Sequence, residues 1–327
     1  MRHPRRANRA RLFAVLAAAA LAVTACGGGA GGGGGASGGS LGAIDLSGAS
    51  FTVGSKEFTE QIVLGEIAVQ ALQATAADVG ELTSITGTTN VRTALTAGQI
   101  DMYWEYTGTG WTNHLQHTTA DAAKDPEELY QAVAMEDLAK NKVAWLEPAP
   151  LNNTYAIATA QDRGRQLGVT NLTEYAALVA RDPAQARMCA AAEFLTRDDG
   201  LPGLERTYGF DLAPDAVAEL ELSLVPPQVA SGQNCNFGEV FATNGDVAAN
   251  ELAIVEDDKQ FFVAYNAAMT VRQDVFDQNP RLAEVFGPIS QQLTSDVMRG
   301  LNEQVEVGGE LPEEVAEKFL RDNGFIA

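Results

Sequence analysis

Short apolar runs alternate with amphipathic stretches along the chain from about residue 50 onward. The runs are rich in β-branched and aromatic residues and predict strands, whereas the amphipathic stretches predict helices. The strands predicted in the first half are residues 51–54, 100–104 and 143–146. The predicted helices are residues 59–76, with Thr59 as N-cap and Glu60 in the first turn, a short helix capped by Asn90 and ended by Gly98, and residues 126–140.

The second half continues this alternation after an extended segment at residues 152–159. Its predicted elements are helices over 172–181 and 201–208, the latter capped by Gly209, and strands over 188–194, 218–222, 252–255 and 265–272. The residues from Gln273 onward predict helices that pack on the first half. The pattern predicts an α/β protein with two parallel-sheet lobes. Because the chain crosses between the lobes twice, we expect a two-segment hinge around a cleft.

The first 25 residues have the composition of a signal peptide. Five arginines precede an apolar run over residues 12–23, which is too short for a membrane span. The sequence VTAC that follows, ending at Cys26, is similar to a bacterial lipobox. It predicts a lipid on Cys26 and an extracytoplasmic protein that this anchor holds on the outer face of a membrane. The alternative is an ordinary signal peptide cleaved at a small-residue site.

The domain boundaries follow from the same patterns. Residues 1–25 are the predicted signal peptide, and residues 26–50 hold the lipidated cysteine and a flexible Gly/Ser tether. We expect one lobe to comprise residues 51–154 together with 262–327, and the second lobe to comprise residues 155–261.

The remaining cysteines predict a disulfide. If Cys26 carries a lipid, Cys189 and Cys235 are the pair that is left, and disulfides persist in the compartments of exported proteins. The alternative is two buried free thiols.

The chain is strongly acidic, with a formal net charge of −21. Because the first 25 residues contain five arginines and no acid, the remainder has 17 basic and 43 acidic residues, a net charge of −26. This excludes nucleic acid as a partner, since phosphate binding needs a basic surface. The acidic surface favours solubility, and the alternative is that it attracts cationic solutes.

Signatures of enzymes are scarce, and we expect a protein that is not an enzyme, without cofactor or metal. His114 and His117 are spaced for one helix face, but two ligands without a third make a weak metal site, and we interpret them as surface histidines. Nucleophile-elbow, phosphate-loop and zinc-protease motifs do not occur in the sequence. A pair of glycosidase-like carboxylates stays open, because acids are abundant.

The stretch YWEYTGTGW, Tyr103 to Trp111, concentrates scarce aromatics beside glycines at the carboxyl end of a predicted strand, where ligands of such sheets bind. A quaternary ammonium has no N–H to donate, so a protein binds it with aromatic ring faces, each contact contributing roughly 0.5–2 kcal/mol. A carboxylate on the same ligand would be bound by Lys, Arg or backbone N–H groups. The composition of the stretch therefore favours a binding site.

Several blocks resemble the osmoprotectant-binding lipoproteins of ATP-driven importers for glycine betaine, carnitine and choline. The resemblance covers residues 51–327, with the blocks in family order. The blocks are VGSKEFTEQIVLGEI, GQIDMYWEYTGTGW, LNNTYAIA, EFLTRDDGLPGL, EVFATNG and EDDKQFFVAYN. The resemblance implies a two-lobed type II periplasmic-binding-protein fold that closes on its ligand.

The resemblance also implies the ligand-binding residues. Lys56 and Arg197 match the residues that bind the ligand carboxylate, and Asn153 matches a polar contact that is often acidic in relatives. The residues that match the lining of the site and its aromatic cage are Tyr106, Thr109, Tyr155, Phe241 and Tyr265. Relatives often have tyrosine where this chain has Phe241, so the ring face is kept and the hydroxyl is lost.

The expected function is that of an extracytoplasmic, lipid-anchored binding protein, a monomer, that delivers a small zwitterionic quaternary amine to the permease of an ABC importer. The alternatives are a binding protein for another small polar solute, such as an amino acid, and a surface hydrolase. Choline has no carboxylate for Lys56 and Arg197, so it ranks below the betaines.

Overall fold

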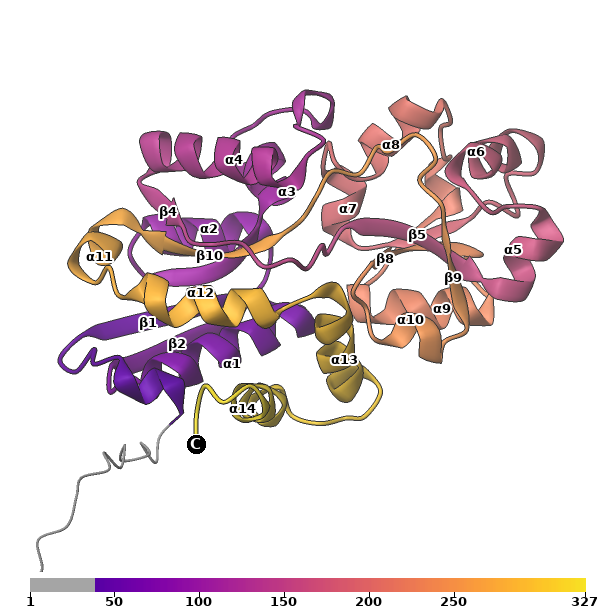
Figure 1. Ribbon diagram of the computed structural model, residues 1–327. Helices are drawn as coiled ribbons and strands as arrows, with labels where there is room; N and C mark the ends of the chain where they lie inside the picture. The colour runs from indigo at the N-terminus through magenta and orange to yellow at the C-terminus, as the bar shows by residue number, and fades with distance from the viewer. Residues whose placement is uncertain (1–38) are drawn as a thin grey trace, which may run out of the picture. The chain divides into compact units, whose positions relative to one another are not determined.

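The computed structural model describes residues 39–327 (Figure 1). The predicted signal peptide, Cys26 and most of the tether lie outside the described residues. Two five-stranded sheets, each with helices packed on it, form two lobes. Within residues 39–327, no helix is both long and apolar enough to span a membrane.

We call the first sheet and the helices packed on it lobe I. The strand order is β2-β1-β3-β10-β4. The strands are β1 (Ser50–Lys56), β2 (Asp78–Ile85), β3 (Met102–Tyr106), β4 (Val143–Trp145) and β10 (Ala267–Arg272). The helices are α1 (Thr59–Gln73), α2 (Thr88–Thr96), α3 (Thr107–Thr109), α4 (Pro126–Asn141), α11 (Gln273–Gln278), α12 (Leu282–Gln292), α13 (Ser295–Glu306) and α14 (Pro312–Asp322).

We call the second sheet and its helices lobe II. The strand order is β7-β6-β8-β5-β9. The strands are β5 (Tyr155–Ala160), β6 (Met188–Ala190), β7 (Val217–Glu219), β8 (Phe237–Phe241) and β9 (Leu252–Val255). The helices are α5 (Gln161–Leu167), α6 (Leu172–Arg181), α7 (Ala192–Thr196), α8 (Leu201–Tyr208), α9 (Val225–Ser231) and α10 (Asp246–Ala249). A disulfide joins Cys189 on β6 to Cys235, just before β8, with 5.6 Å between their Cα atoms.

Both sheets are mixed, which corrects the expectation of parallel sheets. In lobe I, β1 is parallel to β2 and β3, but β10 is antiparallel to both of its neighbours. In lobe II, β6 is parallel to β7 and β8, but β5 is antiparallel to both of its neighbours. The antiparallel strand is in each case the one that enters from the other lobe. It needs no helical crossover and so can run against the other strands.

The two segments that cross between the lobes lie side by side. The Asn153 N–H donates to the Tyr265 carbonyl at 3.0 Å, and the Tyr265 N–H donates to Asn152 Oδ1 at 2.7 Å. The Asn266 side chain donates to the Leu151 carbonyl at 2.9 Å. Bending at this paired ribbon is therefore the motion that moves one lobe relative to the other.

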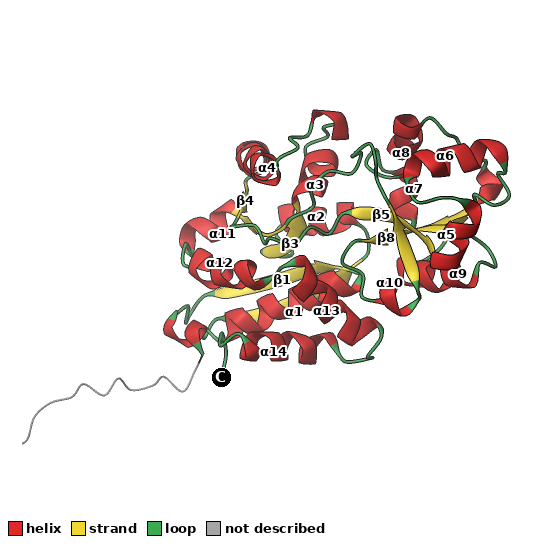
Figure 2. Cartoon of the chain, turned by 45° about the vertical axis from the view of Figure 1, so that its right-hand side comes forward, coloured by secondary structure: helices red, strands yellow, loops and turns green. Residues whose placement is uncertain are grey.

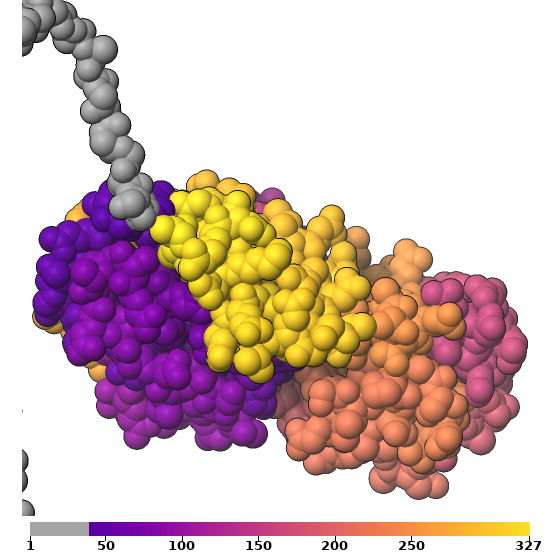
Figure 3. Space-filling model, turned by 90° about the horizontal axis from the view of Figure 1, so that it is seen from below, coloured from indigo at the N-terminus to yellow at the C-terminus, as the bar shows by residue number. Residues whose placement is uncertain are grey.

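The C-terminal helices pack on lobe I, as the sequence predicts. Helices α13 and α14 contact α1, and α4 packs on β4. Figure 2 shows helices on both sides of the two sheets. Figure 3 shows the C-terminal segment, in yellow, lying against the N-terminal part of lobe I, in indigo. Helix α13 also contacts α10 of lobe II.

Several predicted boundaries of helices and strands were wrong. Helix α1 has Phe58 at its N-cap position with no side-chain cap, and Thr59 is already helical. Helix α2 begins at Thr88, and the Asn90 side chain donates to the Thr86 carbonyl instead of capping the helix. The predicted strand 188–194 ends at Ala190, and residues after it form α7. Thr88 at the start of α2 and Ala191 before α7 each donate a backbone N–H to a distant glutamate, a tertiary contact that the local pattern does not contain.

Candidate functional site

A small cavity of about 30 Å³ lies between the two lobes. It has room for about two water molecules. Its lining contains all eight residues that the sequence predicts to bind a ligand. The structure thus brings these residues together. Their role in binding stays a prediction. The lining residues are Lys56, Phe58, Thr88, Tyr106, Thr109, Asn153, Tyr155, Glu193, Arg197, Phe241 and Tyr265.

Aromatic rings form much of the wall. Tyr155 and Phe241 are opposite residues on the antiparallel strands β5 and β8, so their side chains share a face, with ring centroids 5.1 Å apart. Tyr265 lies edge-on to Tyr155 at 5.8 Å, and Phe58 lies 5.2 Å from Phe241 and 6.3 Å from Tyr106. These rings nearly fill the space, so a trimethylammonium group can enter only if they move apart.

The glycines of the stretch YWEYTGTGW make room for two aromatic rings, of which one lines the cavity. Strand β3 ends at Tyr106, and the chain then turns into helical geometry. A Cβ added at Gly108 would lie 2.6 Å from the Tyr265 ring. A Cβ added at Gly110 would lie 2.8 Å from the Trp145 ring. Aromatic rings therefore pack directly on the bare backbone of this turn.

Lys56 forms a buried ion pair inside lobe I. It ends β1, beside the parallel strand β3, and its Nζ lies 2.6 Å from Glu105 Oε1 and 5.4 Å from the centroid of the Tyr106 ring. Glu105 also accepts hydrogen bonds from the Tyr103 hydroxyl at 2.7 Å and from His114 Nε2 at 2.8 Å. Burial raises the pKa of Glu105, but Lys56 and His114 outweigh it and hold this pKa well below its usual range. Glu105 is therefore an anion.

Arg197 forms the corresponding pair in lobe II. Its Nε and Nη2 donate to the two carboxylate oxygens of Asp199 at 2.8 and 2.6 Å, and both residues are buried. Asp199 Oδ2 also accepts from the Tyr265 hydroxyl at 2.5 Å and from Thr112 Oγ1 at 2.9 Å. Burial raises the pKa of Asp199, but the adjacent Arg197 lowers it by more, so the net shift of this pKa is downward. The guanidinium lies 5.6 Å from the Tyr155 ring centroid.

Two buried carboxylates thus pair with the two cations of the cavity. Lys56 pairs with Glu105, and Arg197 pairs with Asp199 and, at 3.4 Å, with the partly exposed Glu193. A lysine has three N–H groups and an arginine has five, so each cation keeps donors for a ligand. Across the cleft, Glu193 of lobe II accepts from the Thr88 N–H and hydroxyl at the start of α2.

The family comparison agrees with this architecture. Residues 49–322 match the model of the OpuAC family, described as the substrate binding domain of an ABC-type glycine betaine transport system. The chain belongs to this family. As an OpuAC-family protein it is the substrate-binding component of an ABC-type transport system.

Individual relatives of this OpuAC-family protein are similar over most of their length. The glycine-betaine-binding protein of Pseudomonas aeruginosa is 33% identical over 281 residues, which cover 84% of this chain and 88% of that protein. The glycine betaine-binding protein YehZ of Escherichia coli is 32% identical over 277 residues, covering 84% and 90%. The solved structure of apo YehZ has a TM-score of 0.62 at 31% identity, covering 84% of this chain and 99% of that chain. The predicted two-lobed fold is confirmed.

Sequence reasoning missed some residues of the OpuAC-family site. Phe58 lies in the block VGSKEFTEQIVLGEI, but strand and helix patterns do not separate a ring on a wall from one in a core. Asp199 is a further residue that the sequence did not single out, and it is 1% exposed. A bidentate pair two residues apart in a loop leaves no periodic signal.

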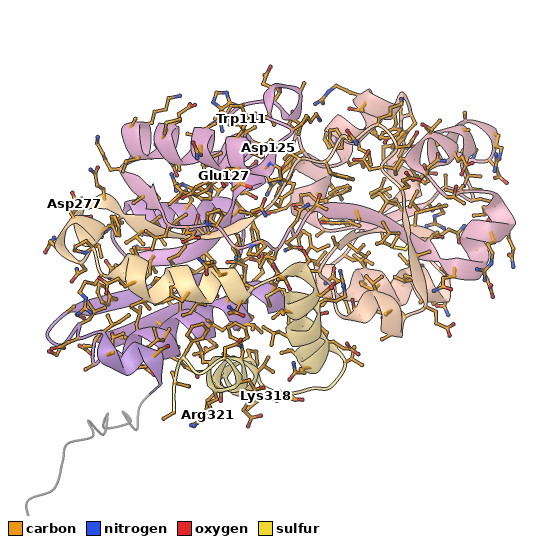
Figure 4. All side chains as sticks on the ribbon, in the orientation of Figure 1. Trp111, Asp125, Glu127, Asp277, Lys318 and Arg321 are labelled. Carbon is orange, nitrogen blue, oxygen red and sulfur yellow. A yellow bond between two sulfur atoms is a disulfide. The ribbon has the colours of Figure 1, made fainter. Side chains whose placement is uncertain are left out.

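The two histidines and Trp111 lie beside the OpuAC-family site. His114 was interpreted as a surface residue, which is wrong, because its side chain is buried against Glu105. His117 stacks on Trp111 at 4.0 Å, and the Trp111 Nε1–H donates to the Thr118 carbonyl at 3.0 Å. Trp111 (Figure 4) therefore packs within its own loop. Within residues 39–327, no cluster of three or more His, Cys, Asp or Glu could hold a metal ion.

Proposed function

We propose that the protein captures a zwitterionic quaternary amine of the glycine betaine type outside the cytoplasmic membrane and passes it to the permease of an ABC importer. The observation that carries the proposal is the cavity between the lobes, where aromatic rings, a lysine and an arginine converge. No covalent chemistry is required of any of these residues.

The rings suit a methylated nitrogen. Such a group offers C–H groups with positive charge and no N–H donors, so ring faces bind it better than a hydrogen-bond acceptor does. The centroid of the Tyr155 ring lies 5.1 Å from that of Phe241 and 5.8 Å from that of Tyr265. An ordinary ammonium would instead need an acceptor of its own in the cavity.

The charges suit a zwitterion. Lys56 and Arg197 retain N–H donors that can bind a carboxylate, as the resemblance implies. Glu105 and Asp199 are the buried partners of the two cations, so these four groups sum to zero charge, and the third acid at the cavity, Glu193, is partly exposed to water. A ligand with no net charge then enters without leaving an unbalanced buried charge. Glycine betaine meets this condition, whereas choline, a cation without a carboxylate, does not.

Closure of the lobes gives the transport cycle its two states. Contacts from both lobes exist together in the closed form, so a ligand that bridges them shifts the population toward closure. A lipid on Cys26 would hold the monomeric protein near its permease, with the Gly/Ser-rich segment as a tether.

A thermal-shift and calorimetric screen tests the proposal. We expect glycine betaine, proline betaine or carnitine to raise the melting temperature and to release or absorb heat on titration. Choline and ergothioneine, the ligand in the name of a Helicobacter pylori relative, are further candidates. Unmethylated glycine is the matched control for glycine betaine and should not bind.

The same screen separates the alternatives. Tyr155→Leu keeps an apolar side chain but removes a ring, and it should weaken betaine binding roughly tenfold, the loss of about 1.4 kcal/mol. Equal binding of glycine and glycine betaine would identify an amino-acid binding protein instead. Conversion of the ligand, detected by mass spectrometry after incubation, would identify a hydrolase. A wild-type protein that binds none of these compounds would refute the proposal.

A further inference from the structure

Glu60 is a buried carboxylate that touches both lobes. It is the second residue of α1 in lobe I and is 3% exposed. Its Oε1 accepts a hydrogen bond from the Tyr106 hydroxyl at 2.8 Å. Its Oε2 lies 2.5 Å from Thr243 Oγ1, in the loop after β8 of lobe II, and 3.1 Å from Asn302 Nδ2 on α13. Burial raises the pKa of this carboxyl group.

These contacts join two walls of the aromatic cage. Tyr106 is a ring of lobe I, and Thr243 follows the lobe II ring Phe241 by two residues. Phe58, two residues before Glu60, lies between the two rings, at 6.3 Å from Tyr106 and 5.2 Å from Phe241. The position of one carboxylate is therefore linked to three rings of the cage.

Glu60 acts from behind the cage wall. It lines a neighbouring cavity on the other side of Phe58 and Phe241, and it is not part of the lining of the ligand cavity. The Thr243 hydroxyl also lies 2.7 Å from Asn153 Oδ1, in the segment that crosses between the lobes. Asn302 Nδ2 donates to the Thr243 carbonyl at 2.8 Å as well. Thr243 thus has partners in lobe I and at the hinge.

We propose that Glu60 is a positioning residue that couples closure of the lobes to the geometry of the aromatic cage, through Thr243 on one side and Tyr106 on the other. This inference rests on the proposed function. Docking of Thr243 against Glu60 fixes the loop that carries Phe241, while the same carboxylate fixes the Tyr106 ring. In the open form Thr243 leaves the carboxylate, and the two rings lose their common support.

Removal of the Thr243 hydroxyl tests the coupling. Thr243→Val keeps the shape of the side chain and removes the hydroxyl that contacts Glu60 across the lobes and Asn153 at the hinge. We expect the dissociation rate constant of glycine betaine to rise about tenfold, with a small change in the association rate, because the lost contact forms after the encounter. Thr243→Ser restores the hydroxyl and should bind within about threefold of wild type.

Two matched controls measure the general cost of losing a buried threonine hydroxyl. The Thr159 hydroxyl donates to the Asn236 carbonyl inside lobe II, and the Thr270 hydroxyl donates to the Tyr103 carbonyl inside lobe I. Thr159→Val and Thr270→Val should lower the melting temperature and leave the dissociation rate constant within about threefold of wild type. If Thr243→Val changes this rate no more than the controls do, the inference is wrong. It is also wrong if Thr243→Ser fails to restore binding.

Small-angle X-ray scattering gives a readout that needs no ligand. We expect ligand-free Thr243→Val to have a larger radius of gyration than ligand-free wild type, because the open form gains population. If wild type binds none of the compounds screened, the proposed function fails, and scattering still decides the coupling. Equal radii of gyration for wild type and Thr243→Val, with and without glycine betaine, would overturn it.

Discussion

Two buried carboxylates, Glu105 and Asp199, each neutralise one cation of the ligand cavity, but they are built differently. The donors to Glu105 in the described part of the chain belong to lobe I: Lys56, Tyr103 and His114, together with the Tyr106 backbone. Asp199 pairs with Arg197 of its own lobe, but it also accepts from Thr112 of lobe I and from Tyr265 in the crossing segment.

The difference separates fold stability from ligand affinity. The Glu105 cluster is complete in lobe I whether the lobes are open or closed, so its loss should destabilise the ligand-free protein. The Asp199 cluster is complete only when Thr112 and Tyr265 meet lobe II, so its loss should weaken the closed, liganded state. One half of the site is preorganised, and the other half is assembled on closure.

The largest effect is expected for Glu105→Gln. The substitution leaves the Lys56 ammonium buried without its counter-charge, which typically costs about 3–5 kcal/mol. Chemical denaturation of the ligand-free protein measures the loss. The matched control is Glu136→Gln, which removes the same charge from a partly exposed glutamate that contacts Lys140 and His117 and should cost about 1 kcal/mol or less. Equal losses for the two variants would contradict a special role for the Glu105 cluster.

The next effect is expected for Asp199→Asn, and it should appear in ligand binding. In the open form water can reach Arg197, so the ligand-free stability should fall by less than it does in Glu105→Gln. In the closed form Arg197 is buried, and glycine betaine should bind roughly 10- to 100-fold more weakly, or about 1.4–2.8 kcal/mol. Calorimetry measures this change. A variant that loses stability but binds normally would show that Asp199 serves the fold alone.

These two clusters also show what the sequence could predict. Lys56 and Arg197 stand in blocks similar to those of a known family, so their place at one cavity could be predicted. Their carboxylate partners could not, because Glu105 lies within β3, a strand in which every residue is buried, so its position does not separate it from core residues. Asp199 lies in a loop beside Asp198, and only the fold decides which of the two turns inward.

The sheets give a similar lesson. The apolar runs predicted β1, β4 and β9 close to their observed positions, because the apolar residues that mark each strand lie within that strand. The direction of β5 and β10 was not predictable from their composition, because it depends on entry from the other lobe. None of the residues of strand β2 is fully buried, and the strand lacks an apolar run, although it pairs with β1 along most of its length.

A matched pair of tyrosines sharpens the comparison further. Tyr103→Phe and Tyr265→Phe each remove one hydroxyl that donates to a buried carboxylate, Glu105 and Asp199 respectively. Such a bond contributes about 1.5–3 kcal/mol. We expect Tyr103→Phe to lose this from ligand-free stability with unchanged affinity. We expect Tyr265→Phe to lose about tenfold in affinity, with a smaller loss of ligand-free stability. The reverse assignment would refute the division between the two lobes.

A separate effect, on pH dependence, concerns a third carboxylate, Glu239 on β8, which is buried near Arg197 without an ion pair to it among the described residues. Burial raises its pKa to about 8, although a hydrogen bond from the Ala191 N–H opposes this. Its folded pKa thus lies above the unfolded value near 4.3. The folded state then holds more protons between these values, so stability is highest at low pH and falls as pH rises toward 8.

Glu239→Gln isolates this contribution, because glutamine keeps an acceptor for the Ala191 N–H and does not titrate. From pH 5 to pH 9 the melting temperature of wild type should fall further than that of the variant, because a pKa raised from about 4.3 to about 8 corresponds to a loss of up to about 4 kcal/mol over this range. Glu105 behaves in the opposite way, since a lowered pKa makes its contribution disappear as pH falls below the unfolded value. Identical melting profiles for wild type and Glu239→Gln would contradict the raised pKa of Glu239. They would mean that water reaches this side chain in solution and that its burial is not maintained.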